Sequence, residues 1–200
     1  PLIPFETLLQ LMGSDDIDEQ HMSCVCYFTY LGRKKINTID QIPRPMLNKV
    51  LELTLQAQQP ILHMCLSLLK RIATVHEYLF DQEIVQRILH TIDRVLTEDP
   101  FICLGVLGNM AYLNINLVED IAIGDRLLLI LPLVEQGNIE EQSQSSVFFS
   151  ILLKHGNMNI ITMMIDVGIV DFMIGLLKSI DDDVIRCILN DFIDVANSKD

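Results

Sequence analysis

The sequence predicts an all-α solenoid, and three observations support that prediction. Half of the 200 residues are hydrophobic, Leu and Ile are abundant, and Trp is absent, which favours helices over strands. Cys24, Cys65 and Cys103 follow one another at intervals of 41 and 38 residues, each at the same place in a similar segment. Apolar residues in those segments recur at helical spacing. A period near 41 residues with two or three helices per unit indicates stacked helical repeats.

The expected repeats share one order of parts: an apolar helix, a polar turn that caps the next helix, and a second apolar helix. No single unit can bury its apolar face alone, so stacking must supply the core. The first four turns lie at residues 13–19, 58–60, 97–100 and 137–141, and the last one at 179–183. We expect about five units in one domain spanning 1–200, at approximately residues 1–42, 43–82, 83–124, 125–167 and 168–200.

Proline and glycine refine these expected boundaries. Pro60 and Pro100 suit the first position of a helix, where a missing N–H costs nothing. The segments 117–123 and 158–167 each precede a glycine, which predicts short extra helices closed by Gly124 and Gly168. Pro132 interrupts an apolar helical pattern and is expected to kink or restart that helix. In the fourth unit the second helix is expected from about Gln142 to Lys154, and the last helix of the chain from about Val184 to Ala196.

Composition and charge exclude several classes of function. The formal net charge is −13, which disfavours nucleic acid as a partner and favours basic ones. The uncharged stretch Phe101–Val118 contains three Asn residues, so we interpret it as a buried helix and expect no membrane insertion. Five cysteines without secreted-scaffold spacing indicate the reducing cytoplasm or nucleus. The apolar Leu2-Ile3 start suggests part of a longer solenoid.

The repeat pattern resembles the armadillo family. Gly168–Val184 follows that family's Gly-x-Ile-Pro-x-Leu-Val-x-Leu-Leu-x-Ser-x-Asp-x-x-Val pattern, with Asp171 at the proline position. The segments 68–73 and 106–111 are similar to its second half. The resemblance covers about residues 3–200 and implies a right-handed superhelix. Within the family, the acidic balance and the Leu-Leu-x-Ser-x-Asp unit look most like a divergent importin-α (karyopherin-α), a nuclear import receptor.

That resemblance implies an extended peptide bound along the third helices by a ladder of Asn and Trp side chains. Only Asn109 keeps the family's residue type, and Arg71 would repel a basic peptide. The implied groove residues are Tyr30, Arg71, Asn109 and Asp194 at Asn positions, and Cys26, Ser67, Gly105 and Asn190 at Trp positions; in the fourth unit they are Ser150 or Ile151 and Ser146 or Val147.

Catalytic and metal chemistry find little support in the sequence. The string His21-x-x-Cys24-x-Cys26 lacks a fourth ligand for structural zinc, and no histidine shares a helix face with Cys65. We expect buried thiols, no cofactor, no metal and no small-molecule substrate.

The acidic turns are interpreted as helix caps, with a ridge for a basic partner as the alternative. The basic cluster at residues 33–35 is expected in a solvated loop, with a transport signal or an acidic contact as alternatives.

The sequence therefore predicts a non-enzymatic adaptor that binds other proteins through extended peptide segments, similar to an importin-α. The alternative is an armadillo scaffold in trafficking, cytoskeletal or degradation complexes that does not bind nuclear signals. Arg71 and the missing Trp ladder favour this alternative, whose groove would take an acidic or mixed peptide.

Overall fold

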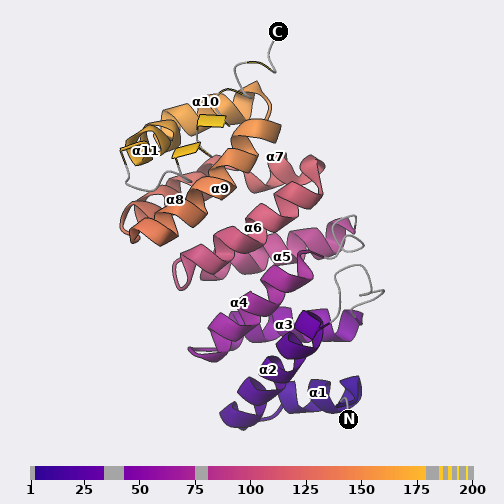
Figure 1. Ribbon diagram of the computed structural model, residues 1–200. Helices are drawn as coiled ribbons and strands as arrows, with labels where there is room; N and C mark the ends of the chain where they lie inside the picture. The colour runs from indigo at the N-terminus through magenta and orange to yellow at the C-terminus, as the bar shows by residue number, and fades with distance from the viewer. Residues whose placement is uncertain are drawn as a thin grey trace. The chain divides into compact units, whose positions relative to one another are not determined.

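The computed structural model describes residues 3–33, 43–74 and 81–178, with a few residues of the segment that follows. Every regular element in these ranges is a helix, which confirms the all-α prediction (Figure 1). The chain divides into two compact units, Pro1–Val106 and Leu107–Asp200, and each is treated separately below.

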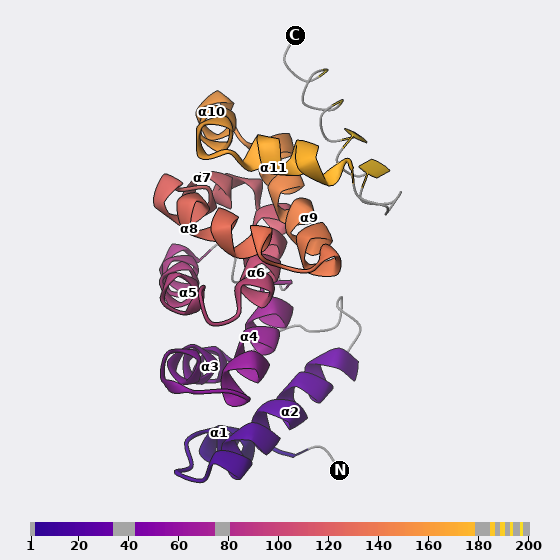
Figure 2. The ribbon, with the colours of Figure 1, turned by 90° about the vertical axis from the view of Figure 1, so that its left-hand side faces the viewer.

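The first unit is built from helix pairs. The pairs are α1 (Phe5–Met12) with α2 (Ile17–Arg33), α3 (Arg44–Gln56) with α4 (Ile61–Ile72), and α5 (Gln82–Val95) with α6 (Pro100–Leu113), whose last turns belong to the second unit. Helix α1 packs on α3 and α3 on α5, while α2 packs on α4. Two layers result, with α1, α3 and α5 on one side and α2, α4 and the start of α6 on the other (Figure 2).

The core of this unit lies between the two layers. Helix α5 buries Ile84, Ile88 and Ile92 at a spacing of four residues, the pattern of an amphipathic helix. Where α2 meets α4, the sulfur atoms of Cys24 and Cys65 are 4.0 Å apart and both residues are fully buried. Cysteine behaves as a small hydrophobic residue. The expectation that these thiols belong to the core is confirmed.

The second unit continues from α6 with a 3-10 helix, η3 (Ile115–Leu117), and five α-helices. These are α7 (Val118–Ile121), α8 (Gly124–Glu135), α9 (Ile139–His155), α10 (Met158–Val167) and α11 (Ile169–Leu176). Helix α10 packs against α8, α9 and α11. The buried Phe149 of α9 meets the ring of Phe172 from α11 edge-on, with 6.0 Å between ring centres.

Short polar side chains cap several of these helices. Asp16, Asp81 and Asp99 each accept a hydrogen bond from a backbone N–H in the first turn of the helix that follows. Asn138 and Glu141 form a reciprocal capping box at the start of α9. The interpretation of the acidic turns as caps is confirmed for these residues, while the turn at 181–183 lies outside the described residues.

Two helices begin earlier than the sequence predicted. The turn expected at 13–19 ends sooner, because capping by Asp16 lets α2 begin at Ile17. Helix α9 begins at Ile139 instead of about Gln142, because Asn138 is the cap and Glu141 already belongs to the first turn. Glutamate inside a capping box is helical, so an acidic turn residue does not always mark a break.

The predictions made from the prolines are confirmed only in part. Pro100 is the first residue of α6, as expected, whereas Pro60 directly precedes α4, which begins at Ile61. Pro132 lies inside α8, and the helix does not restart there. The exposed side chains of Pro132 and Leu128 share one face, so the carbonyl that Pro132 leaves without a partner lies toward solvent.

Short helices do precede both Gly124 and Gly168. Helix α10 spans the expected residues 158–167, whereas the helical segment expected over 117–123 lies at 115–121. The expectation that Gly124 closes a helix is wrong, because α7 ends at Ile121 and Gly124 begins α8. Gly168 closes α10 with φ = 95°, in the left-handed region. Most of the helix expected over 184–196 lies outside the described residues. Within the described ranges no single helix is long and apolar enough to cross a membrane; α10 and α11 together pass that test of length and composition, but they bend by 73°.

The Gly168→Ala variant tests the importance of this left-handed residue. An added Cβ would meet only Leu131 at an ordinary 3.6 Å, so the backbone conformation alone sets the cost. We expect the free energy of unfolding to fall by about 1 kcal/mol, measured by urea denaturation. Gly32→Ala is the control, because Gly32 lies in α2 with no atom near the added methyl group. An equal loss of stability in both variants would contradict the assignment.

Candidate functional site

The surface formed by α2, α4 and the start of α6 in the first unit holds several of the predicted groove residues. On α4, the residues that reach solvent are spaced at i, i+1, i+4, i+7 and i+8, which places them on one face. They are His63, Met64, Ser67, Lys70 and Arg71. The opposite face of α4 is buried in the core. We call the exposed face of α2, α4 and residues 100–106 of α6 the α4 surface.

Arg71 is the central charged residue of the α4 surface. Its side chain reaches across to α2, where a terminal guanidinium nitrogen donates to the carbonyl of Leu31 at 3.4 Å. Leu31 lies in the last turn of α2, where carbonyl groups have no helical partner. The Nε atom of Arg71 is buried and makes no hydrogen bond with any described residue. The guanidinium is therefore half-buried and poorly satisfied.

The side chain of Lys70 lies against the backbone of Gly105. A Cβ atom placed on Gly105 would lie 2.6 Å from Cε and 2.8 Å from Nζ of Lys70. The lysine side chain therefore crosses from α4 onto the backbone of α6 at Gly105, which has no side chain. Gly105, which was predicted as a ladder position, provides the room for this crossing.

Tyr30 is engaged in an aromatic cluster. Its ring meets Phe5 edge-on at 5.3 Å and stacks with Tyr27 at 6.4 Å between ring centres. The side chain is half-buried and lies beside Leu31, the residue that Arg71 contacts. The structure therefore brings together four of the predicted groove residues: Tyr30, Ser67, Arg71 and Gly105.

The α4 surface has a charge opposite to that of the chain. Helices α4 and α6 contain no Asp or Glu, and the acidic residues of α2 are confined to its first turn. Lys70 and Arg71 stand in the last turn of α4. His63 is bonded to Asp99, with 2.9 Å between Nδ1 and Oδ2. A locally basic patch thus lies on a chain of net charge −13.

Cys26 is half-buried on α2, and several other predicted groove residues lie outside the α4 surface. Asn109 is half-buried in the part of α6 that belongs to the second unit, and Asn190 is exposed in the C-terminal segment. Asp194 lies outside the described residues. Arg33 ends α2 instead of lying in a loop, and the rest of the basic cluster, 34–35, is also outside the described residues.

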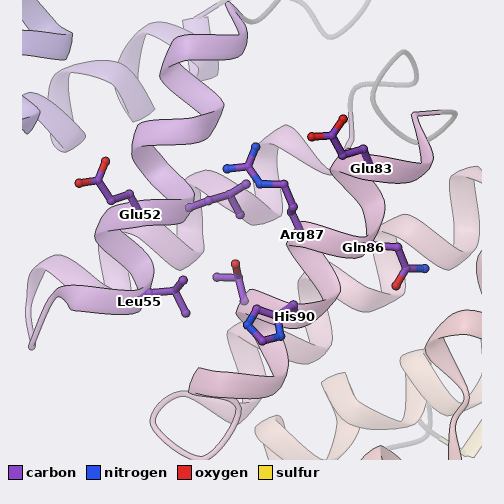
Figure 3. A pocket seen from close by; sticks show the side chains of 8 residues that line it. Glu52, Leu55, Glu83, Gln86, Arg87 and His90 are labelled. Atoms are coloured by element: carbon purple, nitrogen blue, oxygen red, sulfur yellow. The ribbon is translucent and has the colours of Figure 1, made fainter.

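Sequence reasoning missed a pocket on the opposite layer. It has a volume of about 530 Å³ and lies between α3 and α5 (Figure 3). Arg87 extends from α5 toward α3, where it donates to Asn48 at 2.6 Å. The exposed Leu55 was the available signal, because it breaks the amphipathic pattern of α3. The labelled lining residues are Glu52, Leu55, Glu83, Gln86, Arg87 and His90.

Two of the buried thiols, those of Cys65 and Cys103, are poor nucleophiles. The contact with Cys24 and burial raise the pKa of Cys65, whereas the hydrogen bond from Cys65 lowers the pKa of Cys24. Burial, followed by the charges of Asp99 and Asp93, raises the pKa of Cys103 to about 12. Among the described residues, no group of three or more His, Cys, Asp or Glu side chains is placed to hold a metal ion.

No protein-family model matches the sequence, and no curated protein matches it either. Similar folds occur in crystal structures of two engineered proteins, targets OR329 and OR497 of the Northeast Structural Genomics Consortium. The first has a TM-score of 0.77 at 16% identity, over 96% of this chain and 79% of that one. The second has a TM-score of 0.73 at 15% identity, over 97% of this chain and 51% of that one. At such identities the likeness shows the helical fold alone.

Alkylation of the native protein with iodoacetamide tests the thiol environment. We expect Cys65 and Cys103 to stay unmodified at pH 8, because both are fully buried and their raised pKa values keep them protonated. The half-buried Cys26 on α2 is the internal control and should react first. Peptide mapping by mass spectrometry reads out each site. Labelling of Cys103 as fast as Cys26 without denaturant would contradict the assignment.

Proposed function

We propose that this chain is a non-enzymatic protein-binding scaffold that takes an extended peptide on the α4 surface. The observation that supports the proposal best is the gathering of Tyr30, Ser67, Arg71 and Gly105 on neighbouring helices. Tyr30 and Arg71 occupy one equivalent position in successive repeats of the sequence, and Ser67 and Gly105 occupy another. An extended peptide crossing such helices would meet one such position on each of them.

We extend the proposal to the architecture, as about five armadillo-type repeats in a right-handed superhelix. Six polar side-chain contacts among the described residues join distant parts of the sequence, and each spans between 36 and 41 residues. Such spacing fits units that contact only their neighbours. Five of the six contacts lie in the first unit and one, from Asn157 to Glu119 at 2.6 Å, lies in the second.

The arrangement of side chains supports a binding role over catalysis. A nucleophilic thiol requires a base within hydrogen-bonding reach. His63 instead contacts Asp99, and the thiol of Cys103 lies 4.0 Å from the backbone carbonyl of Val95. The free cysteines among the described residues are compatible with a cytoplasmic or nuclear location, which belongs to this proposal.

A diverged importin-α is the more specific form of this proposal. Asn109 favours it, because it alone keeps the residue type of the family's ladder. Arg71 favours the alternative, a scaffold in trafficking, cytoskeletal or degradation complexes, because its guanidinium would repel the lysines of a nuclear signal. Both forms share the peptide-binding surface and differ in the charge of the peptide.

Selection from a phage-displayed library of random 16-residue peptides tests the surface. We expect peptides selected on the wild-type protein to lose at least tenfold in affinity for the Ser67→Trp variant, because the indole would fill the space beside Arg71. Fluorescence polarisation with the selected peptides measures this loss.

Gln56→Trp is the matched control, because Gln56 is exposed at the end of α3 in the opposite layer. Circular dichroism melting establishes that both variants fold. Equal binding by both variants, or the absence of selected peptides, would refute the proposed surface.

A further inference from the structure

We propose that Arg71 anchors the partner through a carboxylate, so that the peptide bound on the α4 surface is an acidic one. This inference rests on the proposed peptide-binding function and assigns the charge of its partner. The carboxylate is that of an Asp or Glu side chain flanked by apolar residues.

The first argument is the unsatisfied guanidinium. Arg71 keeps a charge that never titrates away, and its five N–H donors match a carboxylate in fork geometry. Its side chain makes one hydrogen bond with the described residues, 3.4 Å long, to the carbonyl of Leu31. The buried Nε makes none. A charge in a half-buried position is costly, and a ligand carboxylate at the terminal nitrogens supplies the missing counter-charge.

The second argument is charge. No described carboxylate forms an ion pair with Arg71, although the chain carries 27 acidic residues. The acidic side chains named above serve other contacts: Asp81 pairs with Arg44, Asp99 pairs with His63, and Glu52 pairs with Lys49. The absence of acids from α4 and α6 leaves the last turn of α4 as a positive site. Electrostatic complementarity therefore selects an acidic segment and rejects a basic one.

The third argument is the set of neighbours. Ser67 lies one turn before Arg71 on the same face, so its hydroxyl can donate to the same carboxylate. Lys70 extends over Gly105 toward α6 and carries a second positive charge beside the anchor. The half-buried ring of Tyr30 offers apolar surface on the α2 side. This mixed surface fits one acidic side chain with apolar neighbours better than a polyanion, which the net charge of −13 would repel.

A structural reading of Arg71 leads to a different expectation. Basic residues in the last turn of a helix stabilise its negative end, and Arg71 also bonds a free carbonyl of α2. If these were the only roles of Arg71, replacing it would change the stability of the fold and nothing else. A carboxylate anchor additionally makes the affinity for peptides depend on Arg71, on ionic strength and on the acidic residue of the ligand.

The experiment compares peptides selected from the 16-residue library by the wild-type protein and by Arg71→Gln. We expect the wild type to enrich Asp or Glu at a fixed position between apolar residues. Replacing that residue by Asn or Gln should weaken binding about tenfold, and Arg71→Gln should weaken the unchanged peptide by a similar factor. Binding should also weaken between 50 and 300 mM NaCl.

Matched variants separate charge from shape and from stability. Arg71→Lys keeps the charge but loses the fork, so it should fall between wild type and Arg71→Gln. Arg94→Gln removes an exposed arginine of α5 in the opposite layer and should bind like the wild type. Free glutamate and inorganic phosphate at 10 mM should displace little peptide, which distinguishes a peptide site from a site for small anions.

The outcomes separate this inference from the proposed function. Selected peptides that Ser67→Trp blocks, but that lack acidic enrichment and tolerate Arg71→Gln, would overturn the acidic anchor and leave the peptide surface intact. Peptides enriched in Lys or Arg would overturn it in favour of the importin-like form. If neither the wild type nor any variant selects a peptide, both the acidic anchor and the proposed peptide surface are refuted.

Discussion

The structure depends on one constraint: the helices of this chain are stabilised by packing against other helices, some of them about 40 residues away along the sequence. Helices α1 and α11 have eight residues each, too short to be stable alone in water. What stabilises them is burial of one apolar face. The contact of Cys24 with Cys65 shows this constraint in the core, and the bond from Arg71 to Leu31 shows it at the surface, with separations of 41 and 40 residues.

This constraint also determines where a ligand can bind. Because one face of each helix is committed to its neighbours, only the opposite face can carry specificity. On α4 the buried face holds Cys65 and Leu69, while the exposed face holds Ser67 and Arg71. The core face accepts only small or apolar side chains, whereas the exposed face can change without loss of the fold. A change of ligand in a fold of this kind is therefore expected to alter the residue types on the exposed face, where Arg71 lies.

The existence of the helices was predictable from the sequence because periodicity and caps are local signals. Gly168 and Asn138 illustrate this, since each acts within its own turn. The start of α9 was missed for the same local reason, because Glu141 belongs equally well to a turn and to a capping box. The resemblance to a family supplied the groove positions, including Gly105. It did not supply the reason for that glycine, because the crossing of Lys70 depends on the distance between α4 and α6. The pocket between α3 and α5 was missed because it, too, depends on packing between helices.

The position of Arg71 is explained better by a role in binding than by a role in the stability of the fold. If the residue served only to join α4 to α2, a shorter donor such as Ser or Asn beside the carbonyl of Leu31 would avoid burying a charge. An arginine brings a permanent positive charge into a half-buried position and leaves one donor without an acceptor in the part of the chain that the structure describes. Natural proteins retain such costs mainly where the group has a further use. The use that fits the geometry is the capture of a carboxylate, which supplies a counter-charge to the guanidinium.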